Sequence, residues 1–196
     1  MHFKFEKDVE FMDIPGKRFI IHPNSVASEV VLPENECFCV EGDCLGAGLL
    51  EVSKCLHGKP VVMSSPHFYV PEEAGDSGFN ESLIHGISPS KEAHETIVDI
   101  EPITGVIIRA AKRLQANIKV RKVPDFNTFE NFPSMELPVF WVEESAKLDE
   151  ESGKKLYDKV LGTQKYMTIG SWVAFGLGIV LMIAGGIWAI GSRNRE

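Results

Sequence analysis

Four cysteines lie close together in the chain, and their spacing is the clearest chemical signal in the sequence. They are Cys37, Cys39, Cys44 and Cys55, in the pattern C-x-C-x4-C-x10-C. Zinc sites usually have two C-x2-4-C pairs separated by a longer arm, so this spacing argues against a metal site and favours disulfides formed in an oxidising compartment. Four cysteines allow three pairings, and the spacing does not select one, although the Gly-Asp turn before Cys44 would permit a short Cys39–Cys44 loop.

A second segment has the composition of a nucleophile loop. Gly75-Asp76-Ser77-Gly78 is similar to the serine segment of chymotrypsin-type proteases, but Phe79-Asn80 follows where those proteases continue with glycine and proline. No segment supplies the matching histidine, and the same residue types are ordinary in turns. The sequence also lacks the G-x-S-x-G, phosphate-loop, G-x-G-x-x-G and H-E-x-x-H motifs. We therefore predict no catalytic residues, no cofactor and no enzymatic activity.

An N-glycosylation acceptor sequence, Asn80-Glu81-Ser82, lies in a polar, glycine-rich stretch of the kind that forms surface loops. Because it accompanies a cysteine cluster and a membrane segment, we predict that Asn80 carries a glycan. The histidines are dispersed along the chain, and we expect His67 and His85 to form local hydrogen bonds and not to bind metal.

The C-terminal part of the chain contains an uncharged run from Tyr166 to Ser192. About 20 apolar residues, rising about 1.5 Å each, suffice to cross a hydrocarbon core of about 30 Å. A run of this length is hard to bury in a chain of this size, so it predicts a transmembrane helix and not a core helix. We expect an ectodomain over residues 1–164, a transmembrane helix over 165–192 and a cytoplasmic tail over 193–196.

The charged residues on either side of this helix indicate its orientation, and the small residues within it indicate whether it pairs with another helix. Gly170, Ala174 and Gly178 recur at every fourth position, which predicts a stripe for homo-oligomer formation, although glycine is also common in membrane helices. Lysines are more frequent before the helix than arginines are after it, and this bias alone would place the large domain in the cytosol. The cysteines and the glycan signal favour the opposite orientation, with the large domain extracellular or lumenal.

The net charge excludes one class of partner. The chain carries −8, and residues 1–165 carry −9 because the tail after the uncharged run is net positive. A nucleic-acid-binding domain needs a basic face, so we predict no nucleic-acid partner. The first residues are polar and contain no apolar signal-peptide core, so we expect the chain to be the C-terminal part of a longer protein or a truncated gene product.

The residues before the apolar run read mostly as strands, most clearly over Ile108–Val120. Its apolar positions are Ile108, Ala110, Leu114, Ala116, Ile118 and Val120, and its polar positions are Arg109, Arg113, Gln115, Asn117, Lys119 and, just beyond it, Arg121. A period of two over this length predicts a half-buried strand. We expect the polar face to be solvated, with a ligand surface as the alternative.

Shorter strands are predicted over Arg18–Ile21, Val61–Ser64, Thr96–Ile100 and Leu137–Val142, separated by proline- and glycine-containing turns. Asp149–Leu161 reads as a helix that leads to the membrane. Short connections favour antiparallel pairing. We therefore predict an α+β, β-rich fold with short helices and one C-terminal transmembrane helix.

A set of sequence blocks extends from the cysteines to the long strand. The blocks are Cys37–Cys39, Asp43-Cys44, Gly48–Cys55, Gly58–Pro60, Ser65–Tyr69, Gly86–Thr96, Asp99–Gly105 and Ala111–Asn117. In this order, and in register with the following membrane helix, they resemble the class B scavenger receptor family, particularly its lysosomal branch. The resemblance covers nearly the whole chain.

This resemblance implies the C-terminal part of an antiparallel β-barrel ectodomain with an internal hydrophobic tunnel for lipids. It implies that Cys39 and Cys44 pair with each other, and that Cys37 and Cys55 pair with cysteines earlier in the ectodomain. The first membrane helix, the N-terminal half of the ectodomain and the helical apex of the family have no counterpart in this sequence, and the tail lacks an acidic dileucine lysosomal signal.

Three functional hypotheses follow from the resemblance. In the first, the protein is a receptor in the plasma or lysosomal membrane that binds lipids and lipoproteins and moves sterol, fatty acid or phospholipid through the tunnel to the bilayer. In the second, it is a trafficking receptor that releases a lumenal enzyme at low pH, through histidines that become charged near about pH 6. In the third, it is a non-functional fragment of such a receptor.

Overall fold

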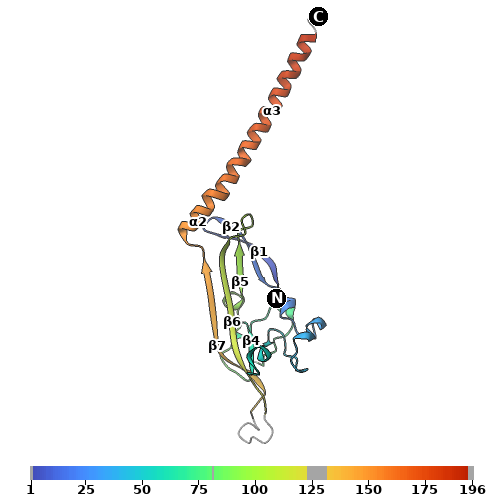
Figure 1. The fold of residues 1–196 in the computed structure, drawn as a ribbon, viewed down its shortest axis with the longest axis vertical. Helices are drawn as coiled ribbons and strands as arrows, with labels where there is room; N and C mark the ends of the chain where they lie inside the picture. Colours follow the sequence, from blue (N-terminus) through green and yellow to red (C-terminus); the bar gives the residue numbers. More distant parts are fainter. Residues whose placement is uncertain (1, 81, 123–131, 194–196) are drawn as a thin grey trace. The chain divides into compact units, whose positions relative to one another are not determined.

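The structure is a computed structural model that describes residues 2–80, 82–122 and 132–193. The chain divides into two compact units. The first unit comprises Met1–Phe11 and Pro15–Leu148, and the second comprises Met12–Ile14 and Asp149–Glu196. The first contains the β-sheet with its connecting segments, and the second contains the long C-terminal helix (Figure 1).

The first unit is built on a mostly antiparallel sheet, which has seven strands among the described residues. One path through the sheet has the order β1-β2-β5-β6-β4-β3, and β7 pairs with β6 outside this path. The strands are β1 (Phe3–Phe11), β2 (Ile14–Ile21), β3 (Leu50–Glu51), β4 (Val61–Ser64), β5 (Ile97–Ile100), β6 (Ile107–Val120) and β7 (Met135–Lys147).

Strand β6 is the centre of this sheet. Its first half pairs with β5 and its second half with β4, so both short strands share one of its edges. Strand β7 pairs antiparallel along almost the whole of the other edge, from Arg109 opposite Lys147 to Val120 opposite Met135. The predicted long strand is therefore confirmed, and it has a paired strand along each of its two edges.

The shorter predicted strands are also present. Strand β4 has the predicted bounds, β5 begins one residue later than predicted, and β2 and β7 extend beyond the predicted segments. Strand β1 was not predicted, although its apolar residues Phe3, Phe5, Val9 and Phe11 follow a period of two that Lys7 alone interrupts. The α+β, β-rich class is confirmed, whereas the closed barrel that the family resemblance implies stays a prediction.

The turn between β1 and β2 consists of two residues, Met12 and Asp13. Both have positive φ angles, 53° and 61°. Two successive left-handed residues form the type I′ turn, whose twist matches that of the flanking antiparallel strands. The short hairpin is thus set by local backbone geometry.

The segments that connect the strands are mostly irregular, with short helical turns. These turns are η1 (Pro23–Ser25), η2 (Pro33–Phe38), η3 (Ser53–Leu56), η4 (Pro66–Phe68), η5 (Glu72–Ala74) and the single α-helical turn α1 (Lys91–His94). A small cluster of buried alanines, Ala27, Ala47 and Ala74, ties three of these segments together. Small residues allow backbones to approach closely here: a Cβ on Gly46 would lie 2.2 Å from the Gly78 Cα atom.

The second unit is helical. Helix α2 (Glu150–Leu156) is capped at its N-terminus by Asp149, whose carboxylate accepts a hydrogen bond from the Ser152 backbone N–H at 3.0 Å. A π-helical segment, Tyr157–Gly162, joins it to α3 (Thr163–Arg193). The predicted helix over Asp149–Leu161 is therefore confirmed in position but changes type in its second half.

Helix α3 contains the whole uncharged run. Among the described residues, one helical stretch is long and apolar enough to cross a membrane, and it includes most of α3. Its apolar part is not buried against other parts of the protein. The predicted tail over residues 193–196 lies outside the described residues except for Arg193.

Candidate functional site: the two faces of the central hairpin

The polar face of β6 is largely buried, so the expectation that it is solvated is wrong. Gln115 is 2% exposed and Asn117 is fully buried. The reason is tertiary: segments that precede β5 in the chain pack over this face, and the His67 backbone N–H donates a hydrogen bond to Gln115 Oε1 at 2.8 Å. Burial without water requires each polar atom on this face to find a protein partner.

Asn117 is the centre of a hydrogen-bonded network that meets this requirement. Its Nδ2 donates to the Val62 carbonyl oxygen and to Ser64 Oγ, both at 3.0 Å. Its Oδ1 accepts a hydrogen bond from Gln115 Nε2 at 2.9 Å. The network ties β6 to β4 through side chains in addition to the backbone ladder.

The basic residues of β6 are neutralised within the first unit. Asp99, which is buried, accepts two hydrogen bonds from Arg18, at 2.7 and 2.9 Å, and one from Arg109 at 2.8 Å. Arg113 donates to Glu143 at 2.7 Å. A guanidinium that already holds a carboxylate has little attraction left for an anionic ligand, which disfavours the alternative of a ligand surface on this face.

Lys119 and Arg121 continue the same pattern at the end of β6. The Lys119 ammonium contacts the carboxylates of Glu51 and, at 2.7 Å, of Asp43, and Arg121 contacts Glu136 at 2.8 Å. Burial alone would lower the pKa of Lys119, but its hydrogen bonds to both carboxylates raise it above the usual value. The residue is therefore held as a cation by one partner from β3 and one from the segment before it.

Two histidines stack on this face beside the network. The rings of His67 and His94 are 4.4 Å apart and nearly parallel, and Trp141 meets the His94 ring edge-on at 6.1 Å. His67 Nδ1 accepts a hydrogen bond from the Ser88 backbone N–H at 3.1 Å. His94 Nδ1 accepts one from the Ser90 backbone N–H at 2.9 Å. Each Nδ1 that accepts a hydrogen bond carries no proton, so this geometry requires neutral Nδ1 atoms on both rings.

The surroundings of His94 disfavour its charged form. Burial, the adjacent His67 ring and the Arg113 guanidinium, in that order, lower the pKa of His94 from its usual value. Glu95, next in the chain, behaves in the opposite way: burial raises the pKa of its carboxyl, which accepts a hydrogen bond from the Tyr69 hydroxyl at 3.3 Å. The local hydrogen bond predicted for His67 is replaced by one from Ser88, 21 residues further along the chain, and the partnership with His94 was not predicted.

We expect His94 to make the free energy of unfolding fall as the pH is lowered. The folded pKa of His94 lies below the unfolded value of about 6.5, so its contribution is complete above that pH and is lost as the pH falls below it. Between pH about 7.5 and 5, the stability advantage of the parent over His94→Gln should therefore shrink. Urea unfolding at the two pH values measures this difference.

A matched control for this measurement is His85→Gln, because the His85 side chain is exposed. A pH-dependent stability difference as large in this variant as in His94→Gln would show that the effect is not specific to His94. The raised pKa of Glu95 gives a pH dependence of stability opposite to that of His94. Because Glu95 is present in both proteins, its contribution cancels when the variant is compared with the parent. An equal pH dependence of the parent and His94→Gln would contradict the prediction.

The opposite face of the β6–β7 hairpin is apolar and open. Leu114, Ala116 and Ile118 lie directly opposite Val142, Phe140 and Leu137 of β7, so their side chains share one face. Ile118 is 42% exposed and Phe140 is 59% exposed. Among the described residues, the apolar face of β6 is therefore less covered by other segments than its polar face is.

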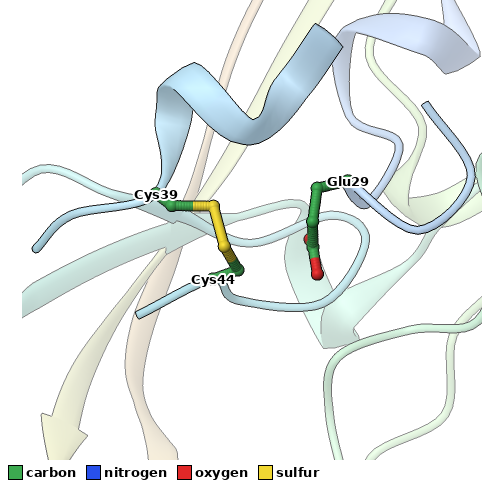
Figure 2. Close-up of side chains that lie close together, drawn as sticks. All are labelled: Glu29, Cys39 and Cys44. Carbon is green, nitrogen blue, oxygen red and sulfur yellow. A yellow bond between two sulfur atoms is a disulfide. The ribbon is translucent and has the colours of Figure 1, made fainter. Parts of the chain in front are cut away.

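The cysteine region lies in the connecting segments of the first unit. Cys39 and Cys44 form a disulfide, while Cys37 and Cys55 are free and exposed. The Glu29 carboxylate lies beside this disulfide, as Figure 2 shows, and ligand atoms of these three residues lie within 4.8 Å of one another. Thiolates bind metal, whereas disulfide sulfurs do not offer that chemistry, so this trio supplies only one metal-binding group.

A cavity of about 430 Å³ opens next to the disulfide. Its walls combine polar groups such as Glu29 and Asn35 with apolar side chains such as Leu32 and Leu49. Asn35 is not free to bind a ligand through its amide nitrogen, which donates at 2.8 Å to the backbone oxygens of Asn24 and Ala27.

The predicted glycan acceptor lies in an exposed loop. Asn80 is exposed, and its Oδ1 accepts hydrogen bonds from the Ser82 backbone N–H at 3.0 Å and the Ser82 hydroxyl at 2.7 Å. Glu81, between them, lies outside the described residues. Glycosylation at Asn80 stays a prediction that this exposure permits.

The remaining predicted positions are not brought together into one site. Ser77 Oγ accepts a hydrogen bond from the Phe79 backbone N–H at 3.2 Å and meets no histidine among the described residues. Gly170, Ala174 and Gly178 lie on α3, where a Cβ added to either glycine would meet no atom within 4 Å. Homo-oligomer formation through this stripe stays a prediction.

Comparison with known proteins adds an independent line of evidence. The model of the CD36 family matches residues 1–189. The chain is 42% identical over 167 residues to lysosome membrane protein 2 of Rattus norvegicus, which covers 85% of this chain and 33% of the relative. It is 41% identical over 147 residues to lysosome membrane protein 2 of Homo sapiens, covering 74% of this chain and 30% of the relative.

An insect relative extends the match. Sensory neuron membrane protein 2 of Drosophila melanogaster is 30% identical over 200 residues, covering 97% of this chain and 35% of the relative. The chain thus spans about a third of the length of these curated relatives. The match includes the blocks around the cysteines, the histidines and β6, which confirms the resemblance that these blocks carry. Since nearly its whole length matches the family model, the chain belongs to the CD36 family of membrane proteins.

Proposed function

We propose that the protein is a membrane-anchored receptor that binds lipid or lipoprotein and passes lipid to the bilayer. Residues 1–164 would lie outside the cytosol, in the lumen or the extracellular space, with α3 as the anchor in the plasma or lysosomal membrane. The Cys39–Cys44 disulfide supports this orientation, because disulfides persist in oxidising compartments.

The observation that carries the proposal is the open apolar face of the β6–β7 hairpin. A water-exposed surface of large apolar side chains on two paired strands is unfavourable unless something covers it. Acyl chains or a sterol would gain about 0.8 kcal/mol for each CH₂ group removed from water there. The chain continues from β7 through α2 directly into α3, so the strand that bears this surface is covalently close to the membrane anchor.

The other chemistry of the first unit is consistent with binding and not with catalysis. Its buried polar face is occupied by hydrogen bonds and ion pairs between its own residues, which leaves the apolar face as the surface for a ligand. Recognition by apolar area does not depend on a specific head group, and this property suits a receptor for lipids of several classes.

Uptake of labelled cholesterol by cells that express the protein tests this proposal. Expressing cells should take up more label than empty-vector cells, and Phe140→Glu should reduce the excess by about tenfold, because burial of a phenylalanine side chain against lipid contributes at least about 1.5 kcal/mol. Uptake equal to that of empty-vector cells would refute lipid transfer.

Val30→Glu is the matched control for this experiment. Val30 is also a strongly exposed apolar residue, but it lies in a loop between η1 and η2 and not on the β6–β7 face. This variant should keep the parent uptake at equal expression. Equal losses in Val30→Glu and Phe140→Glu would show that the apolar face has no special role.

The stacked histidines favour a second candidate function, a trafficking receptor that releases a soluble partner at low pH. Protonation of His94 would place a positive charge on a ring stacked 4.4 Å from the His67 ring and would break the hydrogen bond that His94 Nδ1 accepts from Ser90. Pull-down of lumenal proteins at pH about 7 and about 5 separates this function from lipid transfer. A partner retained equally at both pH values would count against acid release.

A further inference from the structure

A cluster of lysines lies in the second unit, between α2 and the apolar part of α3. Lys154 and Lys155 are in α2, Lys159 is in the π-helical segment and Lys165 is in α3, and all four are exposed. Lys155 forms an ion pair with Glu151 at 2.5 Å. The other three have no ion-pair partner among the described residues.

The charge of this segment is opposite to that of the protein as a whole. The chain carries −8, yet residues 153–166 contain four lysines and a single acidic residue, Asp158. Most lysines of the first unit contact a carboxylate, as Lys17, Lys91 and Lys119 do, and those without an ion-pair partner among the described residues are spread along the chain. Unpaired cations are therefore concentrated where the chain approaches the apolar run.

Helix geometry sets the depth of these lysines relative to a bilayer. Lys165 immediately precedes Tyr166, where the uncharged run begins. With a rise of about 1.5 Å per residue, Lys159 lies about 10 Å and Lys154 about 18 Å before the start of that run. Headgroups extend about 5–8 Å beyond the hydrocarbon on each side, and long lysine side chains reach several ångströms further. Lys159 and Lys165 thus lie at headgroup level, and Lys154 lies within about one Debye length of it.

Aromatic residues mark the same level. Tyr157 and Tyr166 flank the lysines Lys159 and Lys165, and both tyrosine side chains are exposed. Tyrosine is enriched where a membrane helix passes through the headgroup region, because its ring is apolar and its hydroxyl is polar.

We propose that residues 153–166 bind anionic phospholipid headgroups in the leaflet at the N-terminal end of α3. The lysines supply point charges for phosphate and carboxylate groups, and the tyrosines supply rings at the boundary with the acyl chains. The inference requires only that α3 spans a bilayer and does not depend on lipid transfer. It gives the acidic first unit an attachment segment that an anionic leaflet attracts and does not repel.

Lipid selectivity around the helix tests this proposal. The chain, with Trp141→Phe and Trp188→Phe so that Trp172 is its single tryptophan, is reconstituted in vesicles that contain brominated phosphatidylserine or brominated phosphatidylcholine. Quenching of Trp172 fluorescence gives the relative association constant of the two lipids. We expect phosphatidylserine to be preferred by about three- to tenfold, and the preference to fall towards one at about 0.5 M salt.

The variant Lys154→Gln/Lys159→Gln/Lys165→Gln should lower this preference to about one. The control Lys7→Gln/Lys59→Gln/Lys122→Gln removes the same charge from exposed lysines of the first unit and should leave it unchanged. Equal quenching by the two lipids in the parent, or a preference that survives the first triple substitution, overturns the proposal. Absence of quenching by either lipid overturns it together with the membrane anchor, whereas headgroup preference without cholesterol uptake refutes lipid transfer alone.

Discussion

Replacement of Asp99 by alanine is expected to lower the free energy of unfolding by about 3 kcal/mol. Asp99 is the buried carboxylate between Arg18 and Arg109, and its side chain is 1% exposed. Removal of the carboxylate would leave the Arg18 guanidinium, itself largely buried, without a counter-charge. Uncompensated buried charges of this kind cost about 3–5 kcal/mol, and we take the lower end because Arg109 can turn to solvent.

Urea unfolding of the reconstituted chain, followed by the near-ultraviolet signal of the first unit, measures this loss. Asp8→Ala is the control, since Asp8 forms an ion pair with Lys17 at 3.0 Å in which both side chains are exposed. Its effect should stay within about 0.5 kcal/mol, because solvent screens exposed pairs. Similar losses for the two variants would mean that burial of the Asp99 pair contributes nothing.

The substitution Asn117→Leu is expected to lower the free energy of unfolding by about 2–3 kcal/mol. Leucine has a similar size, so little empty space is created, but it forms none of the hydrogen bonds of Asn117. The Val62 carbonyl, the Ser64 hydroxyl and the Gln115 amide would each lose a partner in a region closed to water. The stability loss is therefore due to unpaired polar groups and not to a cavity.

A double substitution separates these two explanations. In Gln115→Leu/Asn117→Leu both amides are removed together, so the loss should be smaller than the sum of the two single losses. Asn24→Leu, at an exposed asparagine whose side chain donates no hydrogen bond within the described residues, should change stability by less than about 0.5 kcal/mol. Strict additivity of the two β6 substitutions would contradict the network.

Local patterns in the sequence were sufficient for the main elements. The period of two over Ile108–Val120 predicted β6, and the uncharged run from Tyr166 predicted a membrane helix within α3. Both patterns act over short distances along the chain: side chains alternate on any strand, and a helix in lipid needs apolar side chains on all sides. The tight spacing between Cys39 and Cys44 also permitted the short disulfide loop that the structure contains.

The sequence alone misassigned the faces of β6. Alternation separates polar from apolar side chains, but it does not say which face other segments will cover. The segments before β5 pack over the polar face, where ion pairs and amide networks replace water, and Ile118 and Phe140 remain exposed on the other side. A signal was present: Gln115 and Asn117 interrupt the basic residues with neutral amides, which suit a buried network.

Periodicity and hydrophobicity by themselves determined the long strand and the apolar helix, because each depends on residues near one another in the chain, and the ordered sequence blocks carried the resemblance to the family. Only the tertiary structure decided that His67 stacks on His94, that Asp99 joins two arginines from different strands and that the apolar face is the open one. These contacts join segments separated by tens of residues, and the covering of a face depends on how the intervening loops fold back, which no local pattern specifies.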